Sequence, residues 1–290
     1  MGYRSEDGVY HHPDRKAIFL GDFIDRGPRQ LDTVNIARRM VETGNALAVM
    51  GNHEFNALAW HKEDPEQPGE YLRPHTPSNH RQHQRFLEEV GAHSRIHDDI
   101  MAWFSSLPLY LDLPGLRVIH ACWHPEYLDA LQPHLDDDNR LDDGLLTTAS
   151  RQHRMEYRAV ETVLKGLEVP LPPGSSFHDK DGKKREHIRI RWWDRSQTTY
   201  RTAALLPSAT AQTLPDAPMP LTHGVGYDDA KPLFIGHYWM NGTLEPLTPT
   251  IACVDYSAGK GSGPLAAYRW SGESQLTARH FEHCGTASVS

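Results

Sequence analysis

The first sixty residues alternate between short apolar runs and segments with helical periodicity. Residues 17–20 (AIFL) and 46–50 (ALAVM) are apolar runs of the length found in buried strands. Between them, residues 30–44 carry apolar side chains at helical spacing and end in a glycine, which suits a helix C-terminus. Another helix is expected to open over residues 53–60. This alternation with short connections predicts parallel strands and right-handed crossovers, and therefore an α/β fold.

The middle of the chain predicts loops and helices around one pair of strands. Residues 61–79 are polar and rich in proline, which indicates a loop, and helical patterns follow over about 80–90 and 95–106. The segments PLYLDL and LRVIH read as two strands joined at Pro114–Gly115. Helical patterns then continue to about residue 165.

The C-terminal part predicts mostly strands between loops. Residues 172–184 read as a loop, residues 186–193 as an alternating strand, and residues 207–230 as a proline-rich loop. Four further strands are expected, over residues 232–236, 250–256, 264–270 and 275–281. No internal repeat is found, so we interpret residues 1–290 as a single domain. We expect it to contain insertions near 61–107 and 125–185.

Composition narrows the possible classes of protein. The 290 residues are 38% hydrophobic and 23% charged, which is typical of a globular chain. No apolar run approaches the roughly 18 residues of a membrane span, and the polar N-terminus does not resemble a signal peptide. A net charge of -8 argues against bulk nucleic-acid binding, which needs a basic face. Three widely spaced cysteines favour the reducing cytoplasm over a disulfide framework.

Four predicted strands are followed by side chains that can bind a metal ion. These side chains are Asp22, Asn52, His120 and His237. In open α/β sheets, ligands bind beyond the carboxyl ends of the strands, so we expect one shared site. A single histidine after a strand is more often structural than a metal ligand. Four such strand ends together favour a metal centre.

The same segments carry a second kind of polar group. Asp25 and Arg26 follow Asp22, and His53 follows Asn52. Displacement at phosphorus needs a nucleophile, a positive group on the phosphoryl oxygens and a proton for the leaving group. An arginine binds phosphate oxygens, and a histidine oriented by a carboxylate donates a proton near neutral pH. The alternative, a surface ion pair beside a helix N-terminus, is weakened by the four neighbouring metal-binding groups.

These motifs resemble those of the calcineurin-like metallophosphoesterases. GDFIDRG and GNHE, thirty positions apart, are similar to the signature blocks of that family. The closer resemblance is to its phosphoprotein-phosphatase-type branch, which includes diadenosine tetraphosphatases and bacterial Ser/Thr phosphatases. The segments FSSLPLYLDLPGLRVIHACWHPE, LFIGHYW and IACVDYSAGKGSGPLAAYRW resemble later blocks of the same branch. The resemblance implies an α-β-β-α sandwich of two mixed sheets.

The resemblance also implies a metal centre. Asp22 would bridge two metal ions, and Asn52, His120 and His237 would complete one of them. A hydroxide between the two ions would attack phosphorus in line. Mixed oxygen and imidazole donors suit Mn or Fe, with Zn or Ni as alternatives.

The remaining roles that the resemblance implies concern the proton and the phosphate. His53 would be the general acid, Asp25 its orienting partner and Arg26 a phosphate contact. Three further residues are candidates for substrate binding: Arg191, Arg195 and His124.

One block of the family pattern is not found. The family begins with a G-D-x-H-G block that completes the second ion, whereas residues 1–8 look like the tail of the helix that would follow it. The only upstream candidates are Asp7, His11 and His12. One ion therefore keeps four protein ligands and the other keeps one. We expect a start assigned too late or a truncation, and a fold without its first strand and helix.

The sequence thus predicts a metal-dependent phosphoesterase that hydrolyses phosphoanhydride or phosphomonoester bonds. A phosphorylated small molecule or nucleotide is the expected substrate, and a phosphoprotein, as for a Ser/Thr phosphatase, is the alternative. A second class is a catalytically impaired protein that keeps the fold and one metal ion or none.

Overall fold

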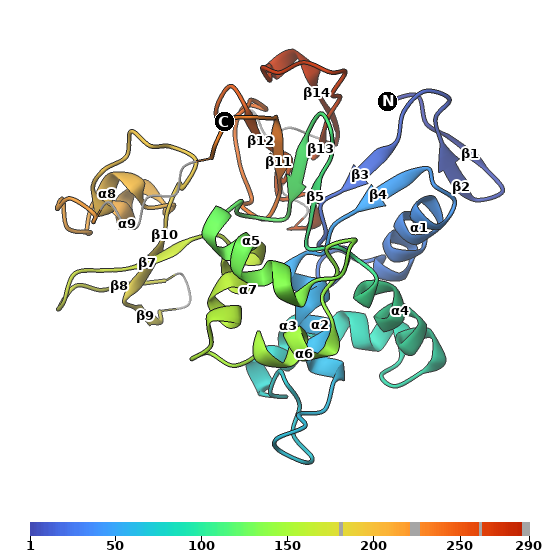
Figure 1. Ribbon diagram of the computed structural model, residues 1–290, viewed down its shortest axis with the longest axis horizontal. Coiled ribbons are helices and arrows are strands. Elements are labelled where there is room, and N and C mark those ends of the chain that lie inside the picture. The colour runs from blue at the N-terminus through green and yellow to red at the C-terminus, as the bar shows by residue number, and fades with distance from the viewer. Residues whose placement is uncertain (180–181, 221–226, 261–262, 286–290) are drawn as a thin grey trace.

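Parallel strands form the centre of the structure, which is a computed structural model describing residues 1–179, 182–220, 227–260 and 263–285 (Figure 1). A four-stranded sheet has the order β12-β11-β6-β5, in which β11 is parallel to β12 and β6 while β5 is antiparallel to β6. A separate pair, β3 and β4, is also parallel. The bounds of these strands are Ala17–Phe19 (β3), Ala46–Ala48 (β4), Tyr110–Asp112 (β5), Arg117–Ile119 (β6), Leu233–Ile235 (β11) and Ile251–Cys253 (β12).

Side chains alternate between the two faces of these strands. Along β11, Leu233 and Ile235 belong to the main hydrophobic core, whereas Phe234 belongs to a second core on the other face. Strands covered on both faces read as continuous apolar runs, which is why the sequence shows them as such. The expected parallel β3–α1–β4 unit is confirmed.

Helices cover the face that carries the main core. Their bounds are Gln30–Glu42 (α1), Asn52–His61 (α2), Pro77–Val90 (α3), Arg95–Ser105 (α4), Pro125–Leu131 (α5), Asp143–Thr148 (α6) and Met155–Lys165 (α7). Helix α3 begins before the predicted residue 80, because the Thr76 hydroxyl accepts the backbone N–H of Asn79 and Pro77 fits the first turn.

The opposite face is covered by an antiparallel pair, Leu265–Tyr268 (β13) and Phe281–Cys284 (β14). Tyr268 and Phe281 pack on the second core with Phe234, at ring-centroid distances of 5.2 Å for Tyr268–Phe234 and Tyr268–Phe281. Helices, central strands and this pair stack in layers, so the predicted mixed α/β sandwich is confirmed. The strand expected over 275–281 was misplaced, since a 3-10 turn at Ala278–His280 precedes β14.

A group of short elements lies to the left in Figure 1. Its elements are Glu168–Pro170 (β7), Phe177–His178 (β8), Lys184–Arg185 (β9), His187–Arg189 (β10), Tyr200–Ala203 (α8) and Ser208–Ala211 (α9). The predicted loop over 172–184 contains β8 and the first residue of β9, an antiparallel pair too short to show periodicity. The predicted loop over 207–230 contains α9, and its residues 221–226 lie outside the described residues.

The N-terminus forms a hairpin instead of the predicted helix tail. Strands Arg4–Glu6 (β1) and Val9–His11 (β2) pair across Asp7 and Gly8, whose φ angles are 49° and 75°. Two consecutive residues with positive φ make the type I′ turn that Asp-Gly favours. The Asp-Gly pair in the sequence was therefore the signal for this hairpin.

Two glycines let the loops after β3 and β4 touch backbone to backbone. A Cβ on Gly21 would lie 2.3 Å from the backbone nitrogen of Gly51, and a Cβ on Gly51 would lie 2.5 Å from that of Asp22. Gly21 also has φ +84°, a conformation that costs a side-chain-bearing residue energy. The glycines of GDFIDRG and GNHE are thus required by a close approach of the two loops.

We predict that Gly21→Ala destabilises the fold more than Gly174→Ala. Gly174 has the same φ of +84°, but no atom lies within 4 Å of the place that a Cβ would take, so it isolates the backbone cost of about 1–2 kcal/mol. At Gly21 the steric clash adds about 1–3 kcal/mol. Chemical denaturation of both variants measures the difference, and equal losses would contradict the contact argument.

Candidate active site

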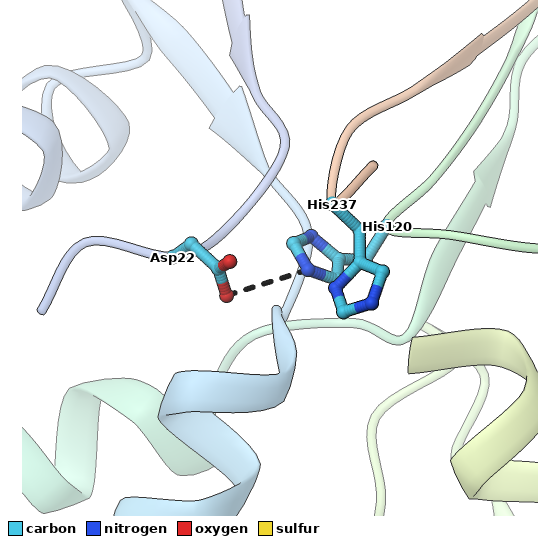
Figure 2. Close-up of side chains that lie close together, drawn as sticks. All are labelled: Asp22, His120 and His237. Carbon is cyan, nitrogen blue, oxygen red and sulfur yellow. Dashed lines mark ion pairs between the residues drawn. The ribbon is translucent and has the colours of Figure 1, made fainter. Parts of the chain in front are cut away.

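The four predicted metal-binding residues lie together at the carboxyl ends of the parallel strands. Asp22 follows β3, Asn52 opens α2 after β4, His120 follows β6, and His237 follows β11. Parallel strands bring these ends to the same edge, which is why positions up to 215 residues apart in the chain meet. Figure 2 shows the Asp22 carboxylate directed toward the two histidine rings.

The distances among these side chains are short. His120 Nε2 lies 3.3 Å from Asp22 Oδ1 and 3.3 Å from Asn52 Oδ1. His237 Nδ1 lies 2.8 Å from Asn52 Oδ1. One potential ligand atom from each of Asp22, His120 and His237 lies within 4.8 Å of the others. Two imidazoles, a carboxylate and an amide oxygen therefore converge on one point.

The chemistry of these donors fits a divalent cation. His120 Nδ1 donates to the backbone carbonyl of Leu20, which directs the Nε2 atom toward the oxygens of Asp22 and Asn52. A histidine that binds a metal usually fixes its other ring nitrogen in this way. Burial and the His120 ring lower the pKa of His237 well below its usual value, so that this imidazole is neutral. Neutral nitrogen and anionic oxygen are the forms that bind metal ions. For His120, burial lowers the pKa but the Asp22 carboxylate outweighs burial and raises the pKa to about 9, so a bound cation would take the place of the second proton on this ring.

A histidine–aspartate–histidine arrangement lies beside the four candidate metal ligands. His53 Nδ1 is 2.8 Å from Asp25 Oδ2, and His83 Nδ1 is 2.7 Å from Asp25 Oδ1. All three side chains are buried. Burial raises the pKa of Asp25, but its hydrogen bonds with the two rings outweigh this effect and lower it. Asp25 is thus an anion held between two rings.

The environment of His53 favours its protonated form. Burial lowers the pKa of the ring, but the carboxylates of Asp22 and Asp25 outweigh burial and raise it. The contact between His53 Nδ1 and Asp25 leaves Nε2 as the nitrogen that can exchange a proton with a ligand. The pairing of His53 with Asp25 that the sequence suggested is therefore present.

Arg26 is exposed beside this arrangement. Its guanidinium lies 5.0 Å from the ring centroid of Trp239, a cation–π distance. The backbone N–H of Gly27 donates to the carbonyl of Gly259 at 3.1 Å, which ties the arginine's loop to the C-terminal part of the chain. A stacked and always-charged guanidinium suits an anionic ligand.

Glu54 holds the loops of the site together, a role that sequence reasoning missed. Its carboxylate accepts the backbone N–H groups of Asp22 at 2.8 Å, Phe23 at 2.8 Å and Gly51 at 3.0 Å, and it is fully buried. Burial and the nearby Asp22 raise its pKa to about 7. Its place three residues after the helix-capping Gly51, as in a capping box, was the available signal.

His83 was also missed. It shares the buried face of α3 with Phe86 and Val90. A titratable residue on an otherwise apolar helix face was the signal for it, although the sequence alone does not show that Asp25 is its partner.

The three residues predicted to bind substrate make contacts elsewhere and not with the candidate metal ligands or the His53–Asp25 pair. Arg191 donates to the carbonyl of Thr202 at 3.2 Å, and Arg195 donates to the carbonyl of Tyr227. His124 stacks on Tyr127 at a ring-centroid distance of 4.1 Å. Their substrate roles stay predictions.

The three upstream candidates also make other contacts. Asp7 forms the turn of the N-terminal hairpin, and its carbonyl accepts from Arg39 at 2.5 Å. His11 Nε2 lies 3.6 Å from Glu6, and His12 Nδ1 accepts the backbone N–H of Asp14 at 3.1 Å.

A second cluster of potential ligands lies where α2 packs on α4. His61, His97 and Asp98 place one ligand atom each within 4.8 Å of the others. However, His97 Nδ1 already accepts the backbone N–H of His93 at 3.2 Å, which puts the proton of the neutral ring on Nε2. Neither nitrogen of this neutral ring therefore has a free lone pair for a metal ion, whereas the Nδ1 atom of His120 is a donor and leaves Nε2 free.

Comparison of the sequence with protein families identifies the class of this protein. The sequence matches the calcineurin-like phosphoesterase family over residues 8–159, just over half of the chain, and the chain belongs to this family. The resemblance inferred from the motifs is thereby confirmed. Phosphoesterases of this family are metal-dependent enzymes with the metallophosphatase fold.

The relatives that the chain resembles are mostly bacterial tetraphosphatases. It is 46% identical over 54 residues to the asymmetrical bis(5'-nucleosyl)-tetraphosphatase PrpE of Geobacillus sp. (strain WCH70), covering 18% of this chain and 22% of that protein. It is 26% identical over 141 residues to the symmetrical bis(5'-nucleosyl)-tetraphosphatase of Marinomonas sp. (strain MWYL1), covering 46% and 45% respectively. The chain thus spans about a fifth to a half of these relatives.

One solved structure that the chain matches is a protein serine/threonine phosphatase from Saccharomyces cerevisiae with similarity to human PP5. The match has a TM-score of 0.42 and 12% identity, and covers 97% of this chain and 73% of that one. Separately, no helix in the described ranges is both long and apolar enough to cross a membrane.

We predict that replacing Glu54 destabilises the protein in proportion to the N–H groups left without an acceptor. In Glu54→Gln, the remaining side-chain oxygen can still accept hydrogen bonds. The side-chain NH₂ group replaces the other oxygen and cannot accept, so at least one backbone N–H group loses its acceptor, at a cost of about 1–3 kcal/mol. Ala leaves all three N–H groups unpaired and should cost more. Chemical denaturation measures both, with the exposed Glu126 changed to Gln and Ala as controls. Equal stability of the Glu54 and Glu126 variants would contradict this role.

Proposed function

We propose that this chain is a metal-dependent phosphoesterase that hydrolyses phosphoanhydride or phosphomonoester bonds. The proposal rests mainly on one observation, which is that two sets of functional side chains lie side by side at the same edge of the sheet. One group is the metal-binding set described above, and the other is the buried His53–Asp25 pair with Arg26 beside it. A metal-binding set alone would support only binding, whereas an adjacent oriented proton donor supports hydrolysis.

His53 serves as the general acid. Asp25 holds its Nδ1, so that Nε2 presents the proton to the leaving oxygen of the substrate. Arg26 binds the oxygens of the reacting phosphoryl group, where its fixed charge offsets the negative charge that the transition state gathers.

Asp22, Asn52, His120 and His237 would hold a divalent ion. When bound there, the ion polarises a phosphoryl oxygen and makes water a better nucleophile at neutral pH. Mixed oxygen and imidazole donors favour Mn or Fe, with Zn or Ni as alternatives. Metal analysis of the purified chain decides between one ion and the two that the resemblance implies.

A nucleotide carrying several phosphates is the substrate class that the relatives favour, because both tetraphosphatases above are named for such substrates. A Ser/Thr phosphatase activity is the competing outcome, and turnover of diadenosine tetraphosphate against a phosphopeptide separates the two. We also propose a cytoplasmic location, which the free and buried thiols of Cys122 and Cys253 support.

We predict that Asp22→Asn and His53→Asn impair turnover to different extents and for different reasons. Asp22→Asn removes an anionic ligand, so bound metal and hydrolysis of an aryl phosphate should both fall below detection. His53→Asn keeps an amide near Asp25 and should retain metal while lowering kcat by about 10²–10⁴-fold. Elemental analysis and steady-state kinetics give the two readouts.

The exposed Asp137→Asn serves as the matched control for both variants. Retained activity in Asp22→Asn would contradict the site assignment. A wild-type chain that binds metal but turns over neither substrate would support the catalytically impaired alternative.

We predict that His83 positions Asp25 for catalysis. His83→Ala removes the donor to Asp25 Oδ1, which should lower kcat by about 10–100-fold with little change in KM. His83→Asn places an amide N–H near the lost Nδ1–H and should recover most of kcat. If kcat in both variants instead falls in step with thermal stability, His83 has only a packing role.

A further inference from the structure

A pocket of about 640 Å³ opens beside the catalytic residues. Asp25, Arg26 and Gly27 line it at the site, and Gly259 lies against the Arg26 side chain. Helix α3 and the loop before β9 complete it with Ser78, Arg81, Gln82, Arg85 and Lys183. The pocket is therefore continuous with the place where the reacting phosphoryl group would bind.

Four cations line this pocket in a chain whose net charge is -8. They are the exposed side chains of Arg26, Arg81, Arg85 and Lys183. Among the ion pairs of the described residues, none involves these four side chains. Asp25 is the one carboxylate among the lining residues, and both of its oxygens already bind histidines. The positive charge of the pocket is thus not neutralised by its own lining.

Helix α3 gains nothing for its own stability from this arrangement. Arg81 and Arg85 are four residues apart on the same face, and like charges at that spacing destabilise a helix. The nearby carboxylates of α3 are engaged elsewhere. Glu88 accepts from Gln84 at 2.6 Å, and Glu89 accepts the backbone N–H groups at the start of α1 at 2.8 Å and 3.0 Å.

We propose that this pocket binds the part of a polyphosphate chain that lies beyond the reacting phosphoryl group. The proposal deepens the proposed function, on which it rests. Arg26 holds the reacting phosphoryl group, while Arg81, Arg85 and Lys183 bind the phosphates that follow. Guanidinium groups bind phosphate oxygens in pairs of hydrogen bonds, and a local cluster of positive charge attracts a polyanion despite an acidic surface.

A phosphoryl group on a protein side chain has no further phosphates to fill this pocket. The pocket therefore determines specificity for phosphoanhydrides over phosphomonoesters, a choice that the sequence left open. One helix would then serve two purposes, since α3 directs His83 inward to Asp25 and Arg81 and Arg85 outward to the substrate.

The test compares two substrates in the double variant Arg81→Gln/Arg85→Gln. Both side chains are exposed, so the fold should be retained. KM for diadenosine tetraphosphate should rise about tenfold or more. The reason is that the double variant loses the charged hydrogen bonds of two guanidinium groups to the phosphates, and together these account for at least a tenfold change in affinity. Values of kcat/KM for an aryl phosphate should stay within about twofold of wild type. Arg158→Gln, an exposed arginine of α7, is the matched control and should change neither.

Direct binding keeps this test separate from the proposed function. Calorimetric titration with tripolyphosphate should show binding to the wild type and a loss of about tenfold or more in the double variant, whether or not the chain is active. Equal losses for both substrates, an unchanged KM for the tetraphosphate, or equal tripolyphosphate affinity would overturn the proposal. Faster turnover of a phosphopeptide than of the tetraphosphate would also overturn it.

Discussion

The carboxylate of Glu54 is the constraint on which the site depends. Three backbone N–H groups from two loops donate to it, and these loops follow different strands. The loops approach so closely that only glycine fits at positions 21 and 51. Because a buried N–H group without an acceptor is costly, the contact fixes where Asp22 lies relative to Asn52. The candidate metal ligands Asp22 and Asn52 are thus positioned by a residue that is not itself one of the candidates.

Backbone conformation shows where the fold accepts strain to build this site. Asp22, Asp25 and His237 have φ angles of 59°, 67° and 69°, in the left-handed region that residues with side chains seldom adopt. Such conformations persist where surrounding contacts determine them, and they gather at functional sites. At Asp25 those contacts are the two histidine rings and the side-chain oxygen of Gln30, which accepts the Asp25 N–H at 2.7 Å.

The sequence predicted the elements whose signals are local. Apolar runs identified the central strands. The polar residues that follow these strands, Asp22, Asn52, His120 and His237, could be grouped into one candidate site because parallel strands bring such positions together. His83 and Arg81 could not be assigned from the sequence, since their roles depend on how α3 packs beside the Asp25 loop. The sequence analysis did not predict the short strands β8 and β9 or the hairpin at Asp7–Gly8, for a different reason. They are too short for periodicity to reveal.

The net charge of the chain and the local charge of the pocket lead to opposite expectations about the binding of a polyanionic substrate. A charge of -8 would repel a polyanionic substrate at long range, but salt screens charges separated by more than about 10 Å. Within that distance, the substrate meets the pocket cations and a carboxylate, Asp25, that already binds two histidines. The pairing of Asp25 with His53 and His83 therefore has an electrostatic consequence beyond orientation. The protonated form of His53, which its neighbouring carboxylates favour, offsets the charge of Asp25 and so weakens its repulsion of a bound phosphoryl group.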